Sequence, residues 1–461
     1  MSFWKLNHPK DQAAVIQNGR TYTYGDLNDM VGELKNTIEA SDKQLMFILC
    51  SNTLPSLALY LASLQGGQTA CLLPSNIEGS LFDHLVEVYS PRWICQPSNL
   101  RIVEGYEKAH TVLDYEVMQR EVKEPSVMHN DLALLLSTSG TTGNPKMVRL
   151  SYANLQSNAE SIAEYLELTS DERPITTLPM QYSYGLSVIN SHLHAGACLV
   201  LTETAVTSRE FWDQIKEHEV TSIAGVPYIY QMLKRLRFAE MELPSLRTLT
   251  QAGGRLDIGL QSYFAELKNS KNMKFYVMYG QTEATARMSY IPPEKLEQKL
   301  GSIGVAIPGG RLEIDEEGQL IYRGTNVMMG YAESKSELSA GDVNEGRLET
   351  GDLAEQDGDG YFYIVGRMKR FIKLFGLRIN LDDVEKLIEK EIGQQAYCVG
   401  NDTKMGVYVQ DAGLIGQAKD TILSHYHLHP TSFKVEYLEQ IPRLETGKID
   451  YKLLQSLGGL E

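Results

Sequence analysis

Short apolar runs alternate with stretches of helical periodicity through most of the chain. Residues 45–50 (LMFILC) form a continuous apolar run typical of a buried strand, and Leu57, Leu61 and Leu64 follow at the spacing of one helix face. The same strand signal returns at residues 70–74, 132–136, 198–202, 222–225 and 274–278. Alternation of strands and helices predicts mostly parallel sheets covered by helices.

The pattern changes after residue 310. Residues 311–323 indicate two strands around a turn at Glu317 and Gly318, and residues 358–366 indicate a turn followed by an alternating strand. Residues 382–392 have the pattern of a helix. The predicted fold class is therefore α/β, with a large N-terminal domain of two α/β layers plus a small β subdomain, and then a small mobile α+β domain.

The distribution of charge supports a boundary between these domains. Of the 43 basic and 59 acidic residues, 13 of each lie in residues 367–461, so the whole net charge of −16 falls on residues 1–366. We therefore predict domains at 1–366 and 367–461. A strongly acidic surface disfavours binding to nucleic acid.

The length of 461 residues suggests more than one domain, and the composition is that of a globular protein. No apolar run is long enough to predict a membrane span, and the first ten residues contain no apolar signal core. The five cysteines form no close pair and no metal-finger spacing. These features predict a cytoplasmic, reduced protein, and we expect it to be an enzyme.

The most informative stretch is the loop at residues 137–146 (STSGTTGNPK), which follows an apolar run and precedes a helical stripe. Its hydroxyls, its glycines and a lysine are groups that cradle a triphosphate. They are Ser137, Thr138, Ser139, Gly140, Thr141, Thr142, Gly143 and Lys146. It is not a Walker A loop, because Pro145 precedes Lys146 and Met147 follows it. A flexible linker is disfavoured between two such elements.

This loop closely resembles the phosphate loop of the adenylate-forming superfamily, which includes acyl-CoA synthetases, nonribosomal peptide adenylation domains and firefly luciferase. Five other segments resemble motifs of that superfamily, in the expected order. They are 21–27 (TYTYGDL), 279–283 (YGQTE), 350–352 (TGD), 366–373 (GRMKRFIK) and 442–448 (PRLETGK). The resemblance covers essentially the whole chain and implies ATP-dependent activation of a carboxylate, with Mg²⁺, followed by transfer to a thiol.

The resemblance assigns the adenine and magnesium site to Tyr279, Gly280, Gln281, Thr282 and Glu283. This segment follows an apolar run, so it lies at the carboxyl end of a strand, where open α/β sheets bind ligands. A tyrosine ring can stack on a purine, and a glutamate is a hard oxygen ligand suited to Mg²⁺ that carries phosphates. Glu283 is thus the predicted metal ligand, and it is a predicted catalytic residue together with Thr138.

Four further residues take roles from the resemblance. Asp352 is the predicted ribose ligand, because a carboxylate can accept both hydrogen bonds of a diol, and Arg367 is a second ribose or phosphate contact. Lys448 is the predicted catalytic lysine, since its charge can offset the charge that builds up on the α-phosphate. The resemblance also implies that the C-terminal domain rotates after adenylation, about a hinge at Lys369. Many relatives have an aspartate at this hinge position, and others have lysine, as this chain does.

The acid pocket is assigned from two segments. Residues 178–186 (LPMQYSYGL) resemble the family segment that carries an aromatic gate, here Tyr182, and residues 251–255 (QAGGR) place Gly253 and Gly254 beside the acid and the adenine. No acidic residue follows Tyr182 up to Asn190, so nothing there would pair with the ammonium group of an α-amino acid. We therefore predict an organic acid with an uncharged tail.

Three functions compete at this point. The leading one is an acyl-CoA synthetase, whose partners are a small carboxylic acid and coenzyme A. The second is a stand-alone ligase that loads an acyl or aminoacyl group onto the phosphopantetheine of an acyl carrier protein. The third is a nucleotide-binding protein without turnover, and it is disfavoured because Glu283, Asp352 and Lys448 are all present.

Overall fold

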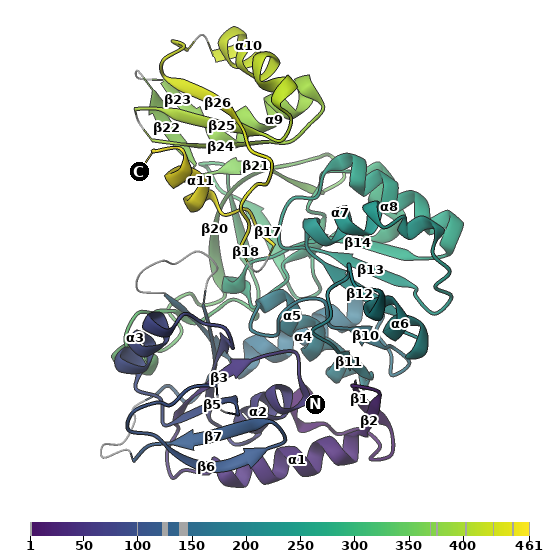
Figure 1. The fold of residues 1–461 in the computed structure, drawn as a ribbon, viewed down its shortest axis with the longest axis vertical. Coiled ribbons are helices and arrows are strands. Elements are labelled where there is room, and N and C mark those ends of the chain that lie inside the picture. The colour runs from purple at the N-terminus through teal and green to yellow at the C-terminus, as the bar shows by residue number, and fades with distance from the viewer. Residues whose placement is uncertain are drawn as a thin grey trace. The chain divides into compact units, whose positions relative to one another are not determined.

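The computed structural model describes residues 2–98, 100–121, 128–137, 146–368, 370–374, 377–401, 403–426, 428–444 and 447–460. The chain forms two compact units (Figure 1). Unit 1 comprises Met1–Arg311 and Tyr322–Leu348, and unit 2 comprises Leu312–Ile321 and Glu349–Glu461. The small β subdomain that we assigned to residues 1–366 thus belongs mostly to unit 2. That residues 367–461 form the mobile domain, with a boundary at residue 366, remains a prediction.

Unit 1 contains a mostly parallel sheet, as the alternation of strands and helices predicts. Its strands follow the order β16 (Val305–Ala306), β15 (Ser289–Tyr290), β14 (Lys274–Tyr279), β13 (Thr248–Gln251), β12 (Ser222–Gly225), β10 (Pro174–Ile175), β11 (Leu199–Leu201), β1 (Ala13–Gln17) and β2 (Arg20–Thr23). Each neighbouring pair from β14 to β1 is parallel. The carboxyl ends of these strands therefore share one edge of the sheet.

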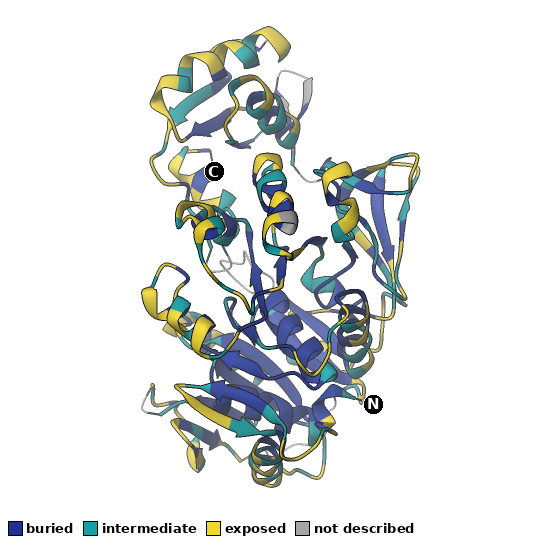
Figure 2. Cartoon of the chain, turned by 90° about the vertical axis from the view of Figure 1, so that its right-hand side faces the viewer, coloured by how far each residue is buried: buried dark blue, intermediate teal, exposed yellow. Residues whose placement is uncertain are grey.

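The second sheet of unit 1 is mixed. Its order is β19 (Gly330–Ala332), β9 (Met147–Ser151), β8 (Leu132–Ser137), β4 (Thr69–Pro74), β3 (Leu45–Cys50), β5 (Trp93–Pro97), β7 (Tyr115–Gln119) and β6 (Glu107–Val112). The central strands β3, β4 and β8 are parallel and almost wholly buried, which explains why they read as continuous apolar runs. Figure 2 shows these strands in the buried colour, with exposed residues on the surrounding helices.

Eight helices of unit 1 lie in the described part of the chain: α1 (Tyr24–Thr37), α2 (Leu54–Gln65), α3 (Gly79–Tyr89), α4 (Tyr152–Tyr165), α5 (Ser183–Ala195), α6 (Arg209–Glu217), α7 (Pro227–Arg235) and α8 (Ile258–Lys271). The predicted N-cap of α4 is confirmed, because the Ser151 hydroxyl accepts from Asn154 N at 3.0 Å and Asn154 Oδ1 accepts from Ser151 N at 2.8 Å. Helices α4 and α5 pack side by side. No helix among the described residues is both long and apolar enough to cross a membrane.

The structure corrects one local expectation around the phosphate loop. We expected a helix to follow the loop, but strand β9 intervenes before α4. Strands β8 and β9 are antiparallel, with Ser137 opposite Met147, so the loop joins two strands of a hairpin. The run from Met147 to Ser151 is only five residues long, and a strand that short carries little periodicity.

Unit 2 contains the predicted β strands and helices of the later part of the chain. One sheet orders β17 (Arg311–Ile314), β18 (Gln319–Arg323), β20 (Arg347–Gln356) and β21 (Phe362–Arg367), and a hairpin joins β22 (Phe371–Leu374) to β23 (Leu377–Asn380). A third sheet holds β24 (Ala396–Gly400), β25 (Met405–Val409) and β26 (Phe433–Tyr437), with helices α9 (Leu381–Ile392), α10 (Ile415–Tyr426) and α11 (Tyr451–Leu457). The predicted α/β class is confirmed, and the later part of the chain combines mostly antiparallel sheets with helices, as expected of an α+β arrangement.

The burial of α5 makes the stability of unit 1 sensitive to pH. Burial, assisted by the charge of Arg287, lowers the pKa of His192 to about 4, although its Nδ1 donates to Val188 O at 2.8 Å. Between about pH 6.5 and pH 4 the unfolded chain therefore binds a proton that the folded chain does not, and stability falls as the pH falls. From pH 7 to pH 5 this group alone costs about 2 kcal/mol.

Urea unfolding tests this expectation, because all three tryptophans (Trp4, Trp93 and Trp212) lie in unit 1 and report its unfolding by fluorescence. The loss of stability from pH 7 to pH 5 should be about 2 kcal/mol smaller in His192→Gln than in the unmodified protein. Equal losses in the two proteins would mean that His192 is not held neutral.

Candidate active site

The carboxyl edge of the parallel sheet gathers the predicted acid and adenine segments. Gly253 and Gly254 follow β13, Tyr279 ends β14, and Tyr182 immediately precedes α5. Gly253 has φ of +83°, and a Cβ at this position would lie 2.5 Å from Tyr182 Oη. The predicted gate and the glycine segment are therefore in close contact, although 71 positions separate them along the chain.

Part of the predicted phosphate loop lies outside the described residues. Ser137 ends β8, and Lys146 immediately precedes β9. The remaining predicted phosphate ligands, and the predicted hinge residue Lys369, are not among the described residues. The ligands concerned are Thr138, Ser139, Gly140, Thr141, Thr142 and Gly143.

Lys146 and Glu283 each contact a residue that stands in none of the recognised motifs, namely Glu333 and Tyr331. Tyr331 Oη donates to Glu283 Oε1 at 2.8 Å, and Lys146 Nζ forms an ion pair with Glu333 Oε1 at 2.7 Å. The Lys146 ammonium also lies 6.0 Å from the centroid of the Tyr331 ring. We call Lys146, Glu283, Tyr331 and Glu333 the Glu283 cluster. It places a cation and two carboxylates around one phenol.

The electrostatics of the Glu283 cluster follow from these contacts. The hydrogen bond and the negative charge of Glu333 raise the pKa of Lys146, so this side chain carries its positive charge at neutral pH. Partial burial of the phenol, with the neighbouring charge of Glu283, raises the pKa of Tyr331 well above its usual value, so the phenol keeps its proton and donates. Lys146 is exposed and can exchange Glu333 for another anion.

Strand β19 owes its position to a buried arginine. Arg149 is 1% exposed, and its guanidinium donates to the carbonyls of Tyr331 at 3.1 Å, Met329 at 2.9 Å and Gly341 at 3.2 Å. Strand β9, which carries Arg149, pairs with β19 in antiparallel register, with Met147 opposite Ala332. This pairing joins positions about 180 residues apart, so it could not be predicted from the local sequence pattern.

The segment from Tyr279 to Glu283 has a fixed local geometry. Gln281 Nε2 donates to Tyr279 Oη at 3.2 Å, and Thr282 Oγ1 lies 3.1 Å from Ser183 Oγ on α5. A Cβ on Gly280 would lie 1.7 Å from the carbonyl oxygen of Ala286, so only glycine fits there. The segment thus connects the end of β14, helix α5 and the Glu283 cluster.

In unit 2 the structure brings together the two predicted ribose contacts. Asp352 on β20 and Arg367 on β21 are direct cross-strand partners, and Asp352 Oδ1 lies 3.0 Å from Arg367 Nε. The side chain of Asp352 is 3% exposed and that of Arg367 is 63% exposed. The carboxylate is therefore almost fully buried, whereas the guanidinium that pairs with it stays largely exposed.

Lys448 lies in a tight turn of unit 2. Leu444 N donates to Lys448 O at 2.8 Å, Gly447 N donates to Leu444 O at 2.8 Å, and Arg443 forms an antiparallel bridge with Ile449. Gly447 has φ of +78°, a conformation that favours glycine over other residues. The Thr-Gly-Lys motif therefore has a structural reason for its glycine, and the half-buried lysine follows it.

The chemistry of unit 1 at this edge suits a nucleotide polyphosphate. Mg²⁺ usually keeps several waters and takes one or two protein carboxylates, because substrate phosphates supply other ligands. Glu283 offers a carboxylate of this kind, and Tyr331 Oη donates a hydrogen bond to it. Lys146 supplies a mobile positive charge nearby. The residues therefore fit a magnesium ion that arrives with phosphates.

Comparisons with known proteins agree with this chemistry. A family model of AMP-binding enzymes matches residues 3–332. The indoleacetate–CoA ligase of Aromatoleum aromaticum is 30% identical over 71% of this chain and 67% of its own. The 2-succinylbenzoate–CoA ligase of Bacillus pumilus is 28% identical over 98% of this chain and 96% of its own. The structure of o-succinylbenzoate CoA synthetase from Bacillus subtilis with its acyl-adenylate intermediate superposes with a TM-score of 0.79 at 23% identity, covering 99% of this chain and 98% of that one.

Proposed function

The chain belongs to the AMP-binding enzyme family and is an ATP-dependent acid–thiol ligase of the acyl-CoA synthetase type, and we propose which residues perform each half-reaction and which acids it accepts. The observation that carries the proposal is the Glu283 cluster beside the carboxyl edge of the parallel sheet. It supplies a metal ligand and a phosphate-binding cation in unit 1.

In the first half-reaction a carboxylate oxygen of the acid attacks the α-phosphorus of ATP. A new P–O bond forms, the bond to the β-phosphate oxygen breaks, and pyrophosphate leaves. Lys146, with Ser137 and the loop residues 138–143, binds the departing phosphates. Glu283 would hold Mg²⁺, and the ion would supply positive charge that offsets the charge of the phosphates. Lys448 contacts the α-phosphate and offsets the charge that develops there.

The nucleoside is held by residues of different chemistry. Tyr279 stacks on the adenine, the Gly253–Gly254 segment leaves room beside it, and Asp352 accepts the two hydrogen bonds of the ribose diol. Arg367, which pairs with Asp352 at 3.0 Å, orients that carboxylate for the diol. These contacts bind ATP and the adenylate alike, so they hold the intermediate between the two half-reactions.

In the second half-reaction the thiol of coenzyme A attacks the acyl carbon of the adenylate, a thioester forms and AMP leaves. A carrier protein is the alternative acceptor, since its phosphopantetheine presents the same thiol. The two acceptors are distinguished by incubating the enzyme with ATP, an acid and either free coenzyme A or a carrier protein that bears phosphopantetheine, and by measuring the thioester formed. Thioester formation with free coenzyme A at a rate comparable to adenylation supports coenzyme A as the acceptor.

The acid pocket should reject α-amino acids. Helix α5, which follows Tyr182, contains no acidic residue, and the buried Arg287 packs against Tyr184 of that helix. An α-ammonium group would find no counter-ion there and would meet a like charge. Exchange of labelled pyrophosphate into ATP should therefore be at least about tenfold faster with an acid than with its α-amino counterpart, for example with succinate than with aspartate or with 3-phenylpropionate than with phenylalanine. A preference for the amino acid would overturn this assignment.

A proline at the hinge should separate the two half-reactions. We propose that Lys369 is the pivot of the C-terminal domain, and proline fixes φ and removes a backbone donor. Lys369→Pro should keep pyrophosphate exchange within a few-fold and lower thioester formation by more than about tenfold, because only the second half-reaction needs the rotated domain. Lys369→Ala, which leaves the backbone free to rotate, is the control and should retain both. Equal loss of both half-reactions in a folded Lys369→Pro protein would contradict the hinge assignment.

A further inference from the structure

Arg287 is a buried guanidinium surrounded by neutral groups. It is 1% exposed and lies four residues after Glu283. Its Nη1 donates to Tyr165 Oη at 3.2 Å and its Nη2 donates to Ser187 Oγ at 3.2 Å. The guanidinium carbon lies 4.2 Å from the centroid of the Tyr184 ring, and Nε has no acceptor.

The buried Arg149 and the part-buried Arg370 have the acceptors that Arg287 lacks. Arg149 donates to backbone carbonyls, and Arg370 forms ion pairs with Asp382 and with Glu385, the latter at 2.8 Å. Among the described residues no carboxylate forms an ion pair with Arg287; its donors reach two hydroxyls and the sulfur of Met278. The loop at residues 138–145 contains no acidic side chain either. A buried charge without a counter-ion is costly, so a residue of this kind points to an anion that arrives from outside the chain.

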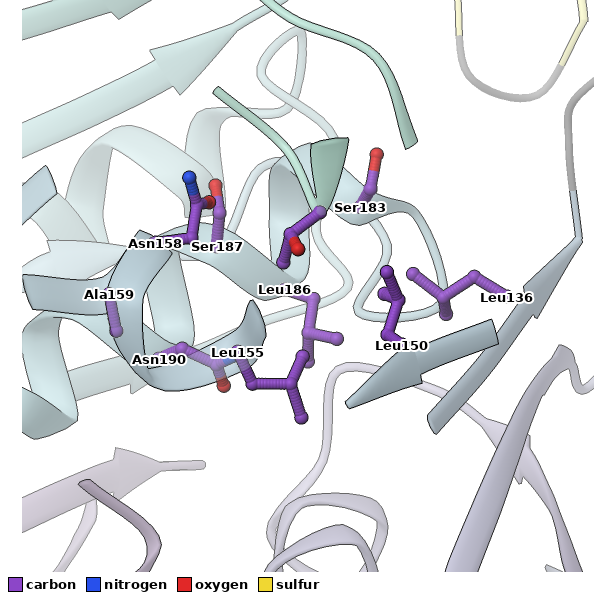
Figure 3. Close-up of a pocket in the computed structure, with 10 residues that line it drawn as sticks. Leu136, Leu150, Leu155, Asn158, Ala159, Ser183, Leu186, Ser187 and Asn190 are labelled. Atoms are coloured by element: carbon purple, nitrogen blue, oxygen red, sulfur yellow. The ribbon is translucent and has the colours of Figure 1, made fainter. Parts of the chain in front are cut away.

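Arg287 lies next to the elements that we assigned to the acid. Tyr184, which covers the guanidinium, follows the gate residue Tyr182 by two positions, and its Oη donates to Thr250 O at 2.7 Å on the strand that leads to Gly253. Ser187, which accepts from Arg287, lines a cavity of about 10 Å³ with Ser183 and Asn158. Figure 3 shows Ser187 and Asn158 with their polar ends on one side of this cavity and leucines on the other.

We propose that Arg287 binds a second carboxylate on the acid substrate, so that the enzyme activates a dicarboxylic acid at one of its two ends. This inference rests on the proposed acid–thiol ligase function and replaces the uncharged tail that the sequence suggested. A guanidinium matches a carboxylate with two parallel hydrogen bonds, and the ring of Tyr184 limits access of water.

Matched pairs of acids test the charge directly. Malonate and succinate are each compared with their monoamides, which keep the length and lose one charge. Pyrophosphate exchange in the unmodified enzyme should be at least about tenfold faster with the diacid, because the amide leaves the guanidinium unpaired. Arg287→Met should lower the diacid rate by about a hundredfold and leave the monoamide rate within a few-fold. Arg287→Lys keeps the positive charge but loses the two parallel N–H donors of the guanidinium, so it should retain part of the preference for the diacid over the monoamide.

The controls separate recognition from folding. Arg209→Met removes an arginine whose side chain is 93% exposed and should change neither rate. Arg287→Met should melt at the same temperature as the unmodified protein or higher, since it removes an uncompensated charge. A lower melting temperature together with equal loss of both rates would show that Arg287 is structural and would overturn the proposal, as would a faster rate with the monoamides.

A binding measurement keeps this inference distinct from the proposed function. Succinate or malonate should raise the melting temperature of the unmodified protein more than the monoamide does, and Arg287→Met should abolish the difference. This shift needs no turnover. If no acid supports exchange but the shift depends on Arg287, the ligase function fails and the anion site stands. If neither diacid shifts the melting temperature nor supports exchange while simple monoacids do, the anion site is wrong and the ligase function stands.

Discussion

Lys448→Ala should abolish adenylate formation while ATP still binds. In the proposed mechanism the Lys448 ammonium contacts the α-phosphate only as negative charge builds up during attack, so its loss raises the barrier rather than weakening ground-state binding. One oriented charge at a transition state is worth on the order of 3 kcal/mol, so pyrophosphate exchange should fall by roughly a hundredfold or more. The dissociation constant of ATP, measured by equilibrium dialysis, should change by only a few-fold.

Lys452→Ala is a matched control for this experiment. Lys452 lies on α11 four residues after Lys448 and is exposed, so its removal should leave exchange and ATP binding unchanged. Leu444 N bonds to the backbone of residue 448, so the turn should survive the loss of the side chain. Exchange that persists in Lys448→Ala within a few-fold would show that another residue supplies the charge.

Gly280→Ala should inactivate the enzyme through the backbone. The added methyl group would lie 1.7 Å from the carbonyl oxygen and 2.7 Å from the carbonyl carbon of Ala286, and neither is a flexible side-chain end. The segment that carries Glu283 must then shift away from Tyr331. Overpacking of this kind costs roughly 1–3 kcal/mol of stability, and a displaced metal ligand should lower pyrophosphate exchange by more than about a hundredfold.

Gly32→Ala supplies the comparison. Gly32 lies within α1, and a Cβ there meets no atom within 4 Å. This change should raise stability by up to about 1 kcal/mol, because alanine is the better helix former, and should leave exchange unchanged. If Gly280→Ala melts at the temperature of the unmodified protein and retains exchange, the close approach of Ala286 does not constrain the site.

Much of the fold could be predicted because its strongest signals are local. The apolar run at 45–50 became β3 with the same bounds, and the turn at Gly318 joins β17 to β18. What failed depended on pairing between distant residues. Strand β9 is a strand because β8 and β19 flank it, and its five residues alone did not show this. Unit 2 likewise consists of two separate chain segments, because the strands within residues 311–323 form one sheet with strands that begin after residue 346.

The candidate site shows the same difference. Gly253, Glu283 and Asp352 stand in recognisable short motifs, so the sequence alone selected them. Tyr331 and Glu333 stand in no motif that we recognised, and they reach Glu283 and Lys146 only through the register of β9 with β19. Arg287 was missed for another reason. Its position four residues after Glu283 is visible in the sequence, but its lack of a carboxylate partner is a property of the folded chain.

The formation of an acyl-adenylate is the central claim, and oxygen transfer tests it most directly. The acid that supports the fastest pyrophosphate exchange is labelled with ¹⁸O in its reacting carboxylate and turned over with ATP and coenzyme A. If that carboxylate attacks the α-phosphorus, the thiol later leaves one labelled oxygen on the phosphate of AMP, and mass spectrometry should find one ¹⁸O in each AMP formed. Unlabelled AMP, with the label in inorganic phosphate or pyrophosphate instead, would contradict the account, because the carboxylate would then have attacked the γ- or β-phosphorus.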